Sequence, residues 1–298
     1  MRVFITGAAG FIGRAVVNEL LEAGHTIVGL ARSEASAKWL QNKGIEVIRG
    51  TIEDTELLKR AASESDGVIH LAFDLNFSKF VENARVSNEA IRTFGATFAG
   101  SNRPLVLASG TIMIQSDPIA TEDSECDMNN PINVRGIAEE EISRLASQGV
   151  RGSVVRLPPT VHSDDDHGFI YMIGQVARTK GVSVYVGDGH NRWPAGHRSD
   201  AARLFRLALE KGTPGARYHA VGEEGVAMKD IADALGQALG VPTVSKTPEE
   251  ASEHLGGFMA HVIGIDNPSS SKKTQEQLGW TPTGRTLLED IKAGAYTN

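Results

Sequence analysis

The chain has 298 residues, of which 41% are hydrophobic, and a formal net charge of -7 at pH 7. That length and apolar content allow a large buried core, while the acidic balance argues against a nucleic-acid-binding protein, whose surface would be basic. A single cysteine, Cys126, excludes an intramolecular disulfide, and no Cys/His set has zinc-ligand spacing, so we expect no metal site. The sequence shows no signal-peptide pattern and no apolar run of the roughly 20 residues that span a bilayer. We therefore expect a soluble, cytoplasmic protein without nucleic-acid or membrane partners.

Short apolar runs alternate with helix-period segments along the first half of the chain. Predicted strands lie near residues 3–5, 26–30, 46–48, 67–71, 105–108 and 153–157, and predicted helices near 11–23, 55–63, 80–99 and 134–147. This alternation predicts an α/β protein with a doubly wound parallel sheet, the Rossmann fold. In the last of these helices the apolar residues share one face, which leaves Glu139, Glu140 and Glu141 for the solvated side.

The alternation loosens after about residue 157. Helices are predicted near residues 170–179, 200–211, 229–239 and 269–278, with a short strand at 183–186. A loop rich in Asp and His lies between the two parts, at 162–167. We predict one domain over residues 1–157, followed by a mixed region over 158–298 that supplies a small substrate-binding lobe and the final elements of the first domain.

A glycine-rich turn joins the first predicted strand to the first helix. It reads Thr6-Gly7-Ala8-Ala9-Gly10-Phe11-Ile12-Gly13. In such a turn one glycine permits the tight bend, one lets the backbone approach a pyrophosphate, and one lets the helix pack against the sheet, while the helix N-terminus offers N–H donors. The predicted dinucleotide contacts here are Gly7, Ala9, Gly10, Phe11, Ile12 and Gly13. A turn that merely connects strand to helix is the alternative.

The second predicted strand ends in Leu30-Ala31-Arg32-Ser33, without the acid that NAD enzymes place on the ribose 2′-hydroxyl. A guanidinium at Arg32 can instead bind a 2′-phosphate, and Ser33 can add a hydroxyl donor. We therefore predict NADP as the cofactor, with NAD less favoured. A solvated surface arginine is the competing interpretation of Arg32.

These residues give the chain a resemblance to the extended and atypical short-chain dehydrogenase/reductases, a superfamily that includes nucleotide-sugar epimerases and dehydratases. The matching segments are TGAAGFIG at 6–13, HLAF at 70–73, LASGTIM at 107–113, VVRLPPTV at 154–161 and GDGHNRWPAGHRSDAARL at 187–204. The resemblance implies that the first domain binds NAD(P). It also implies further cofactor contacts at Thr51, Ile52, Leu71, Ala72, Phe73, Ala108, Leu157, Pro158 and Thr160.

The active site of that superfamily combines a Ser or Thr with a Tyr-x-x-x-Lys helix. Ser109 matches the serine, but the Tyr falls on Pro131 or Ile132, and the Lys falls on Arg135 or Gly136. Arg135 can replace the positive charge, although a guanidinium stays protonated and is no ordinary general acid. A proton donor is therefore missing.

Two more residues join Ser109 and Arg135 as catalytic candidates. The resemblance suggests that Asp74 replaces an active-site Asn. It could give a proton only if burial beside the nicotinamide kept it protonated; a loop-capping role is the alternative. Thr111 lies two residues beyond Ser109 and either lines the same pocket or is structural. In the second region, Tyr185, Arg192, Trp193 and His197 could line a substrate site, although Trp193 could equally pack in a core.

Three functions stay open at this point. The first is an NADP(H)-dependent oxidoreductase that transfers a hydride to or from a carbonyl or related C=X group of a small molecule. A non-catalytic NADP redox sensor is favoured by the missing Tyr and Lys, and a nucleotide-sugar epimerase or dehydratase would need the absent Tyr. Members of the superfamily often pair through the helices near 80–99 and 134–147, so we also predict a homodimer.

Overall fold

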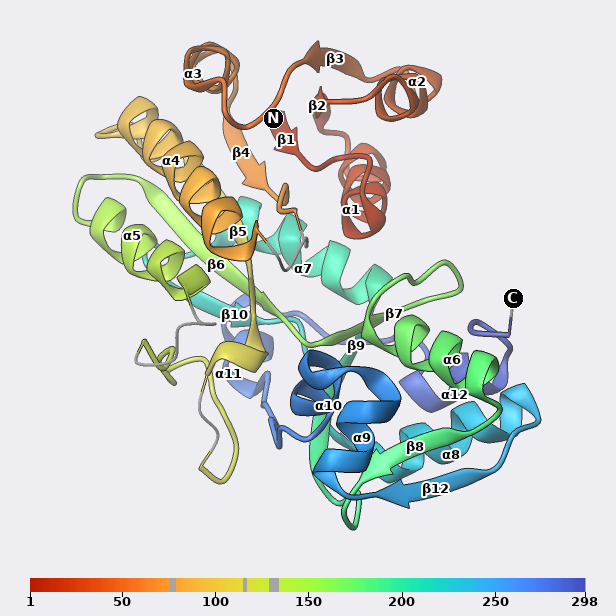
Figure 1. Ribbon diagram of the computed structural model, residues 1–298. Coiled ribbons are helices and arrows are strands. Elements are labelled where there is room, and N and C mark those ends of the chain that lie inside the picture. Colours follow the sequence, from red (N-terminus) through yellow and green to blue (C-terminus); the bar gives the residue numbers. More distant parts are fainter. Residues whose placement is uncertain (75–78, 115–116, 129–133, 298) are drawn as a thin grey trace.

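A computed structural model describes residues 1–74, 79–114, 117–128 and 134–297 (Figure 1). A seven-stranded parallel sheet has the order β10-β6-β5-β4-β1-β2-β3. Its strands are β1 (Arg2–Thr6), β2 (Thr26–Ala31), β3 (Glu46–Arg49), β4 (Gly67–His70), β5 (Pro104–Gly110), β6 (Arg151–Leu157) and β10 (Arg217–His219). The strand order reverses between β1 and β4, which is where doubly wound sheets bind ligands at the carboxyl ends of their strands. The predicted fold class is confirmed.

Helices cover both faces of the sheet. One face carries α1 (Phe11–Glu22), α2 (Glu34–Asn42) and α7 (Arg198–Lys211), and the other carries α3 (Thr55–Ser63), α4 (Phe80–Phe98) and α5 (Gly136–Ala146). The sequence analysis missed α2, which buries only Ala37 and Leu40 and begins at the N-cap Ser33. With nine residues and only two of them buried, this helix offers a short apolar pattern that is easily overlooked.

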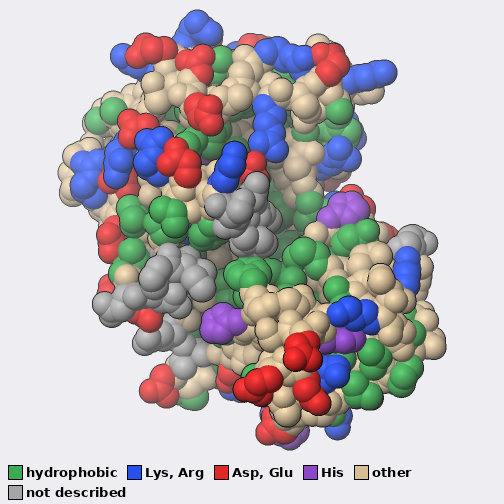
Figure 2. Space-filling model, viewed as in Figure 1, with side chains coloured by type: hydrophobic (Ala, Val, Ile, Leu, Met, Phe, Trp, Pro, Cys, Tyr) green, Lys and Arg blue, Asp and Glu red, His purple; other side chains and the backbone are tan. Residues whose placement is uncertain are grey.

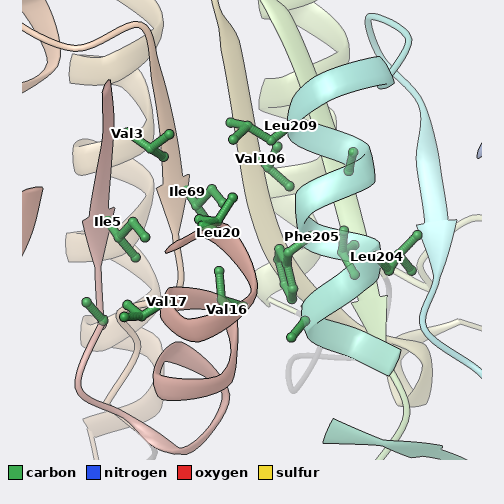
Figure 3. Packing of buried hydrophobic residues seen from close by; sticks show 14 of the residues in the cluster. Val3, Ile5, Val16, Val17, Leu20, Ile69, Val106, Leu204, Phe205 and Leu209 are labelled. Carbon is green, nitrogen blue, oxygen red and sulfur yellow. The ribbon is translucent and has the colours of Figure 1, made fainter. Parts of the chain in front are cut away.

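The core between α1, α7 and the sheet fixes where the glycine turn lies. Figure 3 shows Val16, Val17 and Leu20 of α1 beside residues of β1, β4 and β5, with Leu204, Phe205 and Leu209 of α7 next to them. The side chains named here are all fully excluded from solvent. Burial of this kind contributes roughly 25 cal/mol per Å² of apolar surface, so the start of α1 is held firmly at the end of β1.

The second region forms a lobe and also returns to the sheet. Strands β7 (Thr160–His162), β9 (Arg192–His197) and β11 (Glu223–Ala227) form one small sheet, and β8 (Ser183–Val186) pairs with β12 (Thr243–Lys246). The helices of this region, besides α7, are α6 (Phe169–Lys180), α8 (Met228–Leu239), α9 (Pro248–Leu255), α10 (Gly257–Ile263), α11 (Lys272–Leu278) and α12 (Leu287–Lys292). From this region, β10 joins the edge of the main sheet and α7 packs on one of its faces. In Figure 1 the arrow of β4 points toward the lobe.

The helices α4 and α5 lie side by side on one face of the sheet. They carry charged i,i+3 pairs: Arg85 with Glu82 and Arg92 with Glu89 are exposed, whereas exposed Arg144 pairs with the buried Glu141. A homodimer through these helices would have to accommodate those charges, and it stays a prediction. Among the described residues, no helix combines the length and the apolar character that crossing a membrane requires.

Candidate cofactor and active site

The three glycines of the turn differ in whether the fold has room for a side chain at their positions. A Cβ on Gly13 would lie 2.1 Å from the carbonyl oxygen of Gly7, and one on Gly7 would lie 2.7 Å from the backbone nitrogen of Ala72. Gly7 also has a φ of +72°, which favours glycine. At Gly10 an added Cβ meets only the Gly7 oxygen, at 3.2 Å. The protein itself therefore demands Gly7 and Gly13, while Gly10 leaves space beside the turn.

That space lies at the start of α1, where Gly10 is the N-cap and no side chain caps the helix. The first N–H groups of a helix have no intrahelical acceptor, and the helix dipole adds positive potential there. An uncapped helix N-terminus beside a missing side chain is the geometry that a pyrophosphate needs. The residues present thus fit a dinucleotide.

Buried polar side chains tie the turn to the neighbouring strand. His70 Nδ1 lies 2.7 Å from Thr6 Oγ1, and its Nε2 lies 3.0 Å from Ser87 Oγ of α4. Burial, with a smaller contribution from Arg135, lowers the pKa of His70 to about 3, so the ring is neutral at pH 7. Thr6 Oγ1 also accepts a hydrogen bond from Ala72 N at 3.3 Å. These hydrogen bonds therefore connect the carboxyl ends of β1 and β4 next to the glycine turn.

The remaining predicted cofactor contacts lie at or just past the carboxyl ends of the sheet strands: Thr51, Ile52, Leu71, Ala72, Phe73, Ala108, Leu157, Pro158 and Thr160. Figure 2 shows the face at this edge hollowed between the sheet and the lobe, with hydrophobic side chains in the hollow. Thr160 is a less suitable contact than expected, because its buried hydroxyl donates to the carbonyl of Pro194 at 2.6 Å. The others stay predictions.

The end of β2 differs in part from the prediction. Arg32 is exposed, as a phosphate ligand must be, and its Nη1 lies 3.6 Å from Asp74 Oδ2. Ser33 is already used: its Oγ accepts from Ser36 N at 3.2 Å and donates to Ser36 Oγ at 2.9 Å, which caps α2. A phosphate would have to compete with Ser36 for the Ser33 hydroxyl, and the contact stays a prediction.

Ser109 belongs to a buried network of charges that the sequence analysis did not foresee. Its Oγ donates to Glu139 Oε1 at 2.6 Å, and Arg156 binds the same carboxylate through Nε and Nη2 at 2.6–3.1 Å. Glu139 is only 4% exposed and Arg156 is fully buried. The prediction that Glu139 and Glu141 lie on the solvated side of their helix is therefore wrong, since Glu141 is also buried, and it holds for Glu140. Helical periodicity cannot detect an arginine on a neighbouring strand.

The contact of His219 with a backbone carbonyl, at one end of this network, determines the direction of the other hydrogen bonds. His219 Nδ1 lies 2.7 Å from the carbonyl oxygen of Ser270, which can only accept, so Nδ1 carries the proton. His219 Nε2 then accepts from Arg156 Nη1 at 3.3 Å, and Arg156 donates to the Glu139 carboxylate. Because that carboxylate only accepts, Ser109 must give it the hydroxyl proton. In this arrangement the hydroxyl proton of Ser109 is directed at Glu139, which leaves the lone pairs of its oxygen for a ligand.

Arg135 places a second positive charge near the end of β5, besides Arg156. Its Nη2 donates to the carbonyl of Ala108 at 3.0 Å, and its guanidinium stacks on the ring of Phe73 at 4.0 Å. It lines a cavity of about 10 Å³ together with Asn88, Ser87 and Ala108. Burial lowers the pKa of Arg135 to about 10, which leaves it charged at pH 7. Pro131 and Ile132, where the tyrosine falls, lie outside the described residues.

The other two catalytic candidates, Thr111 and Asp74, differ in their burial. Thr111, in a short 3-10 turn (Thr111–Met113), is fully buried, and its hydroxyl has no hydrogen-bond partner within the described part of the chain. Asp74 is 49% exposed at the side chain and faces Arg32. The burial that would keep Asp74 protonated is absent, so its predicted role as a proton donor is not supported.

The polar loop at 162–167 forms ion pairs and does not gather around a metal. Asp164 pairs with Arg285 at 2.8 Å, Asp165 with Arg198 at 2.5 Å, and buried Asp166 accepts from Tyr296 Oη at 2.8 Å. Across the described residues, no group of three or more His, Cys, Asp or Glu could hold a metal ion. The loop connects the lobe to α7 and to the C-terminal helix.

The four lobe residues suggested for a substrate site have separate positions. Trp193 is fully buried in the lobe core, Arg192 pairs with Asp266 at 2.8 Å, and His197 caps α7 through Ser199 N. Tyr185 is partly buried against the same core. Core packing is thus the observed role of Trp193.

The fold and the glycine turn define a dinucleotide-binding protein of the Rossmann type. Residues 3–221 match the model of the NAD dependent epimerase/dehydratase family, so the chain belongs to that family. This confirms the resemblance drawn from the sequence motifs.

The chain is also similar to known proteins in sequence and to a solved structure in fold. The chain is 48% identical to an uncharacterized protein of Schizosaccharomyces pombe, over 99% of this chain and 100% of that one. It is 29% identical to a decarboxylating sterol-4-alpha-carboxylate 3-dehydrogenase of Dictyostelium discoideum, covering 75% and 72%, and 26% identical to a 2-alkyl-3-oxoalkanoate reductase of Stenotrophomonas maltophilia, covering 83% and 78%. The structure of MoeE5 in complex with UDP-glucose and NAD has a TM-score of 0.78 at 20% identity, covering 100% and 98%, and shows the same fold.

Proposed function

We propose that the protein is an NADP(H)-dependent oxidoreductase that moves a hydride to or from a carbonyl or related C=X carbon of a small molecule. The observation that carries this proposal is the uncapped start of α1 beside Gly10, with exposed Arg32 at the end of the adjoining strand β2. The two curated relatives named above as a dehydrogenase and a reductase support a redox function. The nicotinamide would supply the hydride, and the chain's residues would bind and orient the reactants.

Arg135 is the residue that we propose for charge stabilisation in the reaction. Hydride arrival at a carbonyl carbon leaves negative charge on the oxygen, and a partly desolvated guanidinium stabilises such charge without giving up a proton. The proton of Ser109 is held by Glu139, and Thr111 is buried. The proton that completes the product would therefore come from solvent.

A non-catalytic NADP sensor is the second candidate function. The observation that favours it is the same commitment of the Ser109 proton to Glu139, since it removes a conventional donor from the site. In a sensor, NADPH binds but reduces no substrate, and a second protein reads the bound state.

The test is NADPH oxidation measured with a panel of 3-oxo acids and sterol-like ketones. We expect turnover by the wild type, a loss of about 10²–10³ in kcat for Arg135→Ala, and partial recovery in Arg135→Lys. The matched control is Arg144→Ala, which removes an exposed arginine of the same helix. Tight NADPH binding without turnover across the panel would favour the sensor, and absence of NADPH binding would refute both functions.

A further inference from the structure

Two opposite charges face each other at the strand ends on either side of the glycine turn. The strands β2 and β4 are the two neighbours of β1, which leads into the turn. Arg32 directly follows β2, and Asp74 follows β4 by four residues. Their charged groups approach to 3.6 Å between Nη1 and Oδ2, with 73% and 49% of the side chains exposed. The pair therefore spans the end of the strand that begins the cofactor site.

The backbone of Asp74 is positioned by contacts other than Arg32. Asn83 of α4 donates from Nδ2 to the Asp74 carbonyl oxygen at 2.9 Å, and the adjacent Phe73 lies under the Arg135 guanidinium. An exposed ion pair at 3.6 Å is weak in water and exchanges readily with other charged or polar partners. A ligand that enters this region can therefore compete for either side of this ion pair.

We propose that Asp74 supplies the ribose-binding acid that is missing from the end of β2, and that Arg32 and Asp74 together set the choice between NADH and NADPH. This rests on the proposed function, because it requires a dinucleotide at the glycine turn. Wherever Arg32 can bind a 2′-phosphate, a carboxylate 3.6 Å from its guanidinium is close to the same ribose position.

The two cofactors would use the pair in opposite ways. The 2′-hydroxyl of NADH donates to the Asp74 carboxylate, as it does to the acid at the end of β2 in other NAD enzymes. The 2′-phosphate of NADPH binds Arg32 and is repelled by Asp74, since like charges in close proximity disfavour one another. Asp74 thus reduces the difference in affinity between NADPH and NADH that Arg32 creates. We therefore expect both cofactors to bind.

Calorimetric titration of the full chain with NADPH and with NADH tests this directly. We expect Asp74→Asn to tighten NADPH binding by about 2–5-fold and to weaken NADH binding by about 2–5-fold, because one charged contact at an exposed site corresponds to up to about fivefold in affinity. Arg32→Gln should weaken NADPH by about tenfold or more and leave NADH nearly unchanged. Glu82→Gln removes an equally exposed carboxylate from the start of α4, and it serves as the control for net charge.

The outcomes separate this inference from the proposed function. If Asp74→Asn changes both affinities in the same direction, or neither, the pair is only a surface contact and the inference is overturned. In that case a selective loss of NADPH binding in Arg32→Gln would still support the proposed cofactor. If neither cofactor binds the wild type, the proposed function itself fails.

Discussion

The two ends of the proposed site are built on different principles. At the glycine turn, eight consecutive residues determine the geometry, and the main requirement is space next to the backbone. At the end of β5, the position of Ser109 depends on Glu139, Arg156 and His219, which come from a helix and two strands far apart in the sequence. The first end is readable from a motif, whereas the second exists only once the sheet has assembled.

The largest effect should come from breaking the buried network. Glu139→Ala leaves the Arg156 guanidinium buried without its counter-charge, and such a loss typically costs 3–5 kcal/mol of unfolding free energy. Urea unfolding measures it, with Glu140→Ala as the control because Glu140 is exposed on the same helix. A loss below about 1 kcal/mol would mean that the network does not hold this end of the site together.

Lowering the pH should reduce the free energy of unfolding, because two buried histidines are neutral in the folded chain. Burial lowers the pKa of both His70 and His219 to about 3, so the unfolded chain binds more protons than the folded chain between about pH 3 and 6.5. Stability is therefore retained above about pH 6.5 and lost as the pH falls. From pH 7 to pH 5 the two rings together should cost about 3–4 kcal/mol of unfolding free energy.

Urea titrations at the two pH values check this expectation. His70→Asn should reduce the loss by about half, since one of the two titrating rings is gone. A wild-type stability that is equal at pH 7 and pH 5 would contradict the buried neutral state of these histidines.

The glycine turn should show the smallest effect on stability together with a large effect on binding. Gly10→Val places a branched side chain in the space beside the helix start, so we expect no measurable binding of either cofactor and a stability change of about 1 kcal/mol or less. Gly13→Ala should instead destabilise the fold, because its Cβ would collide with the Gly7 carbonyl. Equal cofactor affinity of Gly10→Val and wild type, by calorimetry, would reduce the turn to a connector.

Much of the sheet was predictable because its strands are short apolar runs with regular helical spacers. The small strands of the lobe were not, since β7, β9 and β11 pair with partners far along the chain and carry little periodic signal. The role of Glu139 was missed for the same reason. One signal was available: Arg156 lies inside an apolar strand, and an arginine at such a position usually has a buried acidic partner.

Asp74 illustrates a limit of transferring roles along a motif. Its place after β4 suggested a proton donor, but the side chain extends toward β2 and remains exposed. Sequence spacing fixes which strand end a residue follows, while the direction of its side chain depends on the neighbouring element. The position of Asp74 beside Arg32 is the reason that we propose a cofactor contact for it instead of a proton transfer.

A crystal structure of the protein with NADP⁺ bound tests the central claim most directly. We predict the pyrophosphate against the N–H groups of Phe11 and Ile12, the 2′-phosphate within hydrogen-bonding distance of Arg32, and the nicotinamide beside Arg135. A dinucleotide found elsewhere on the molecule, or a 2′-phosphate pointing into solvent away from Arg32, would contradict the account.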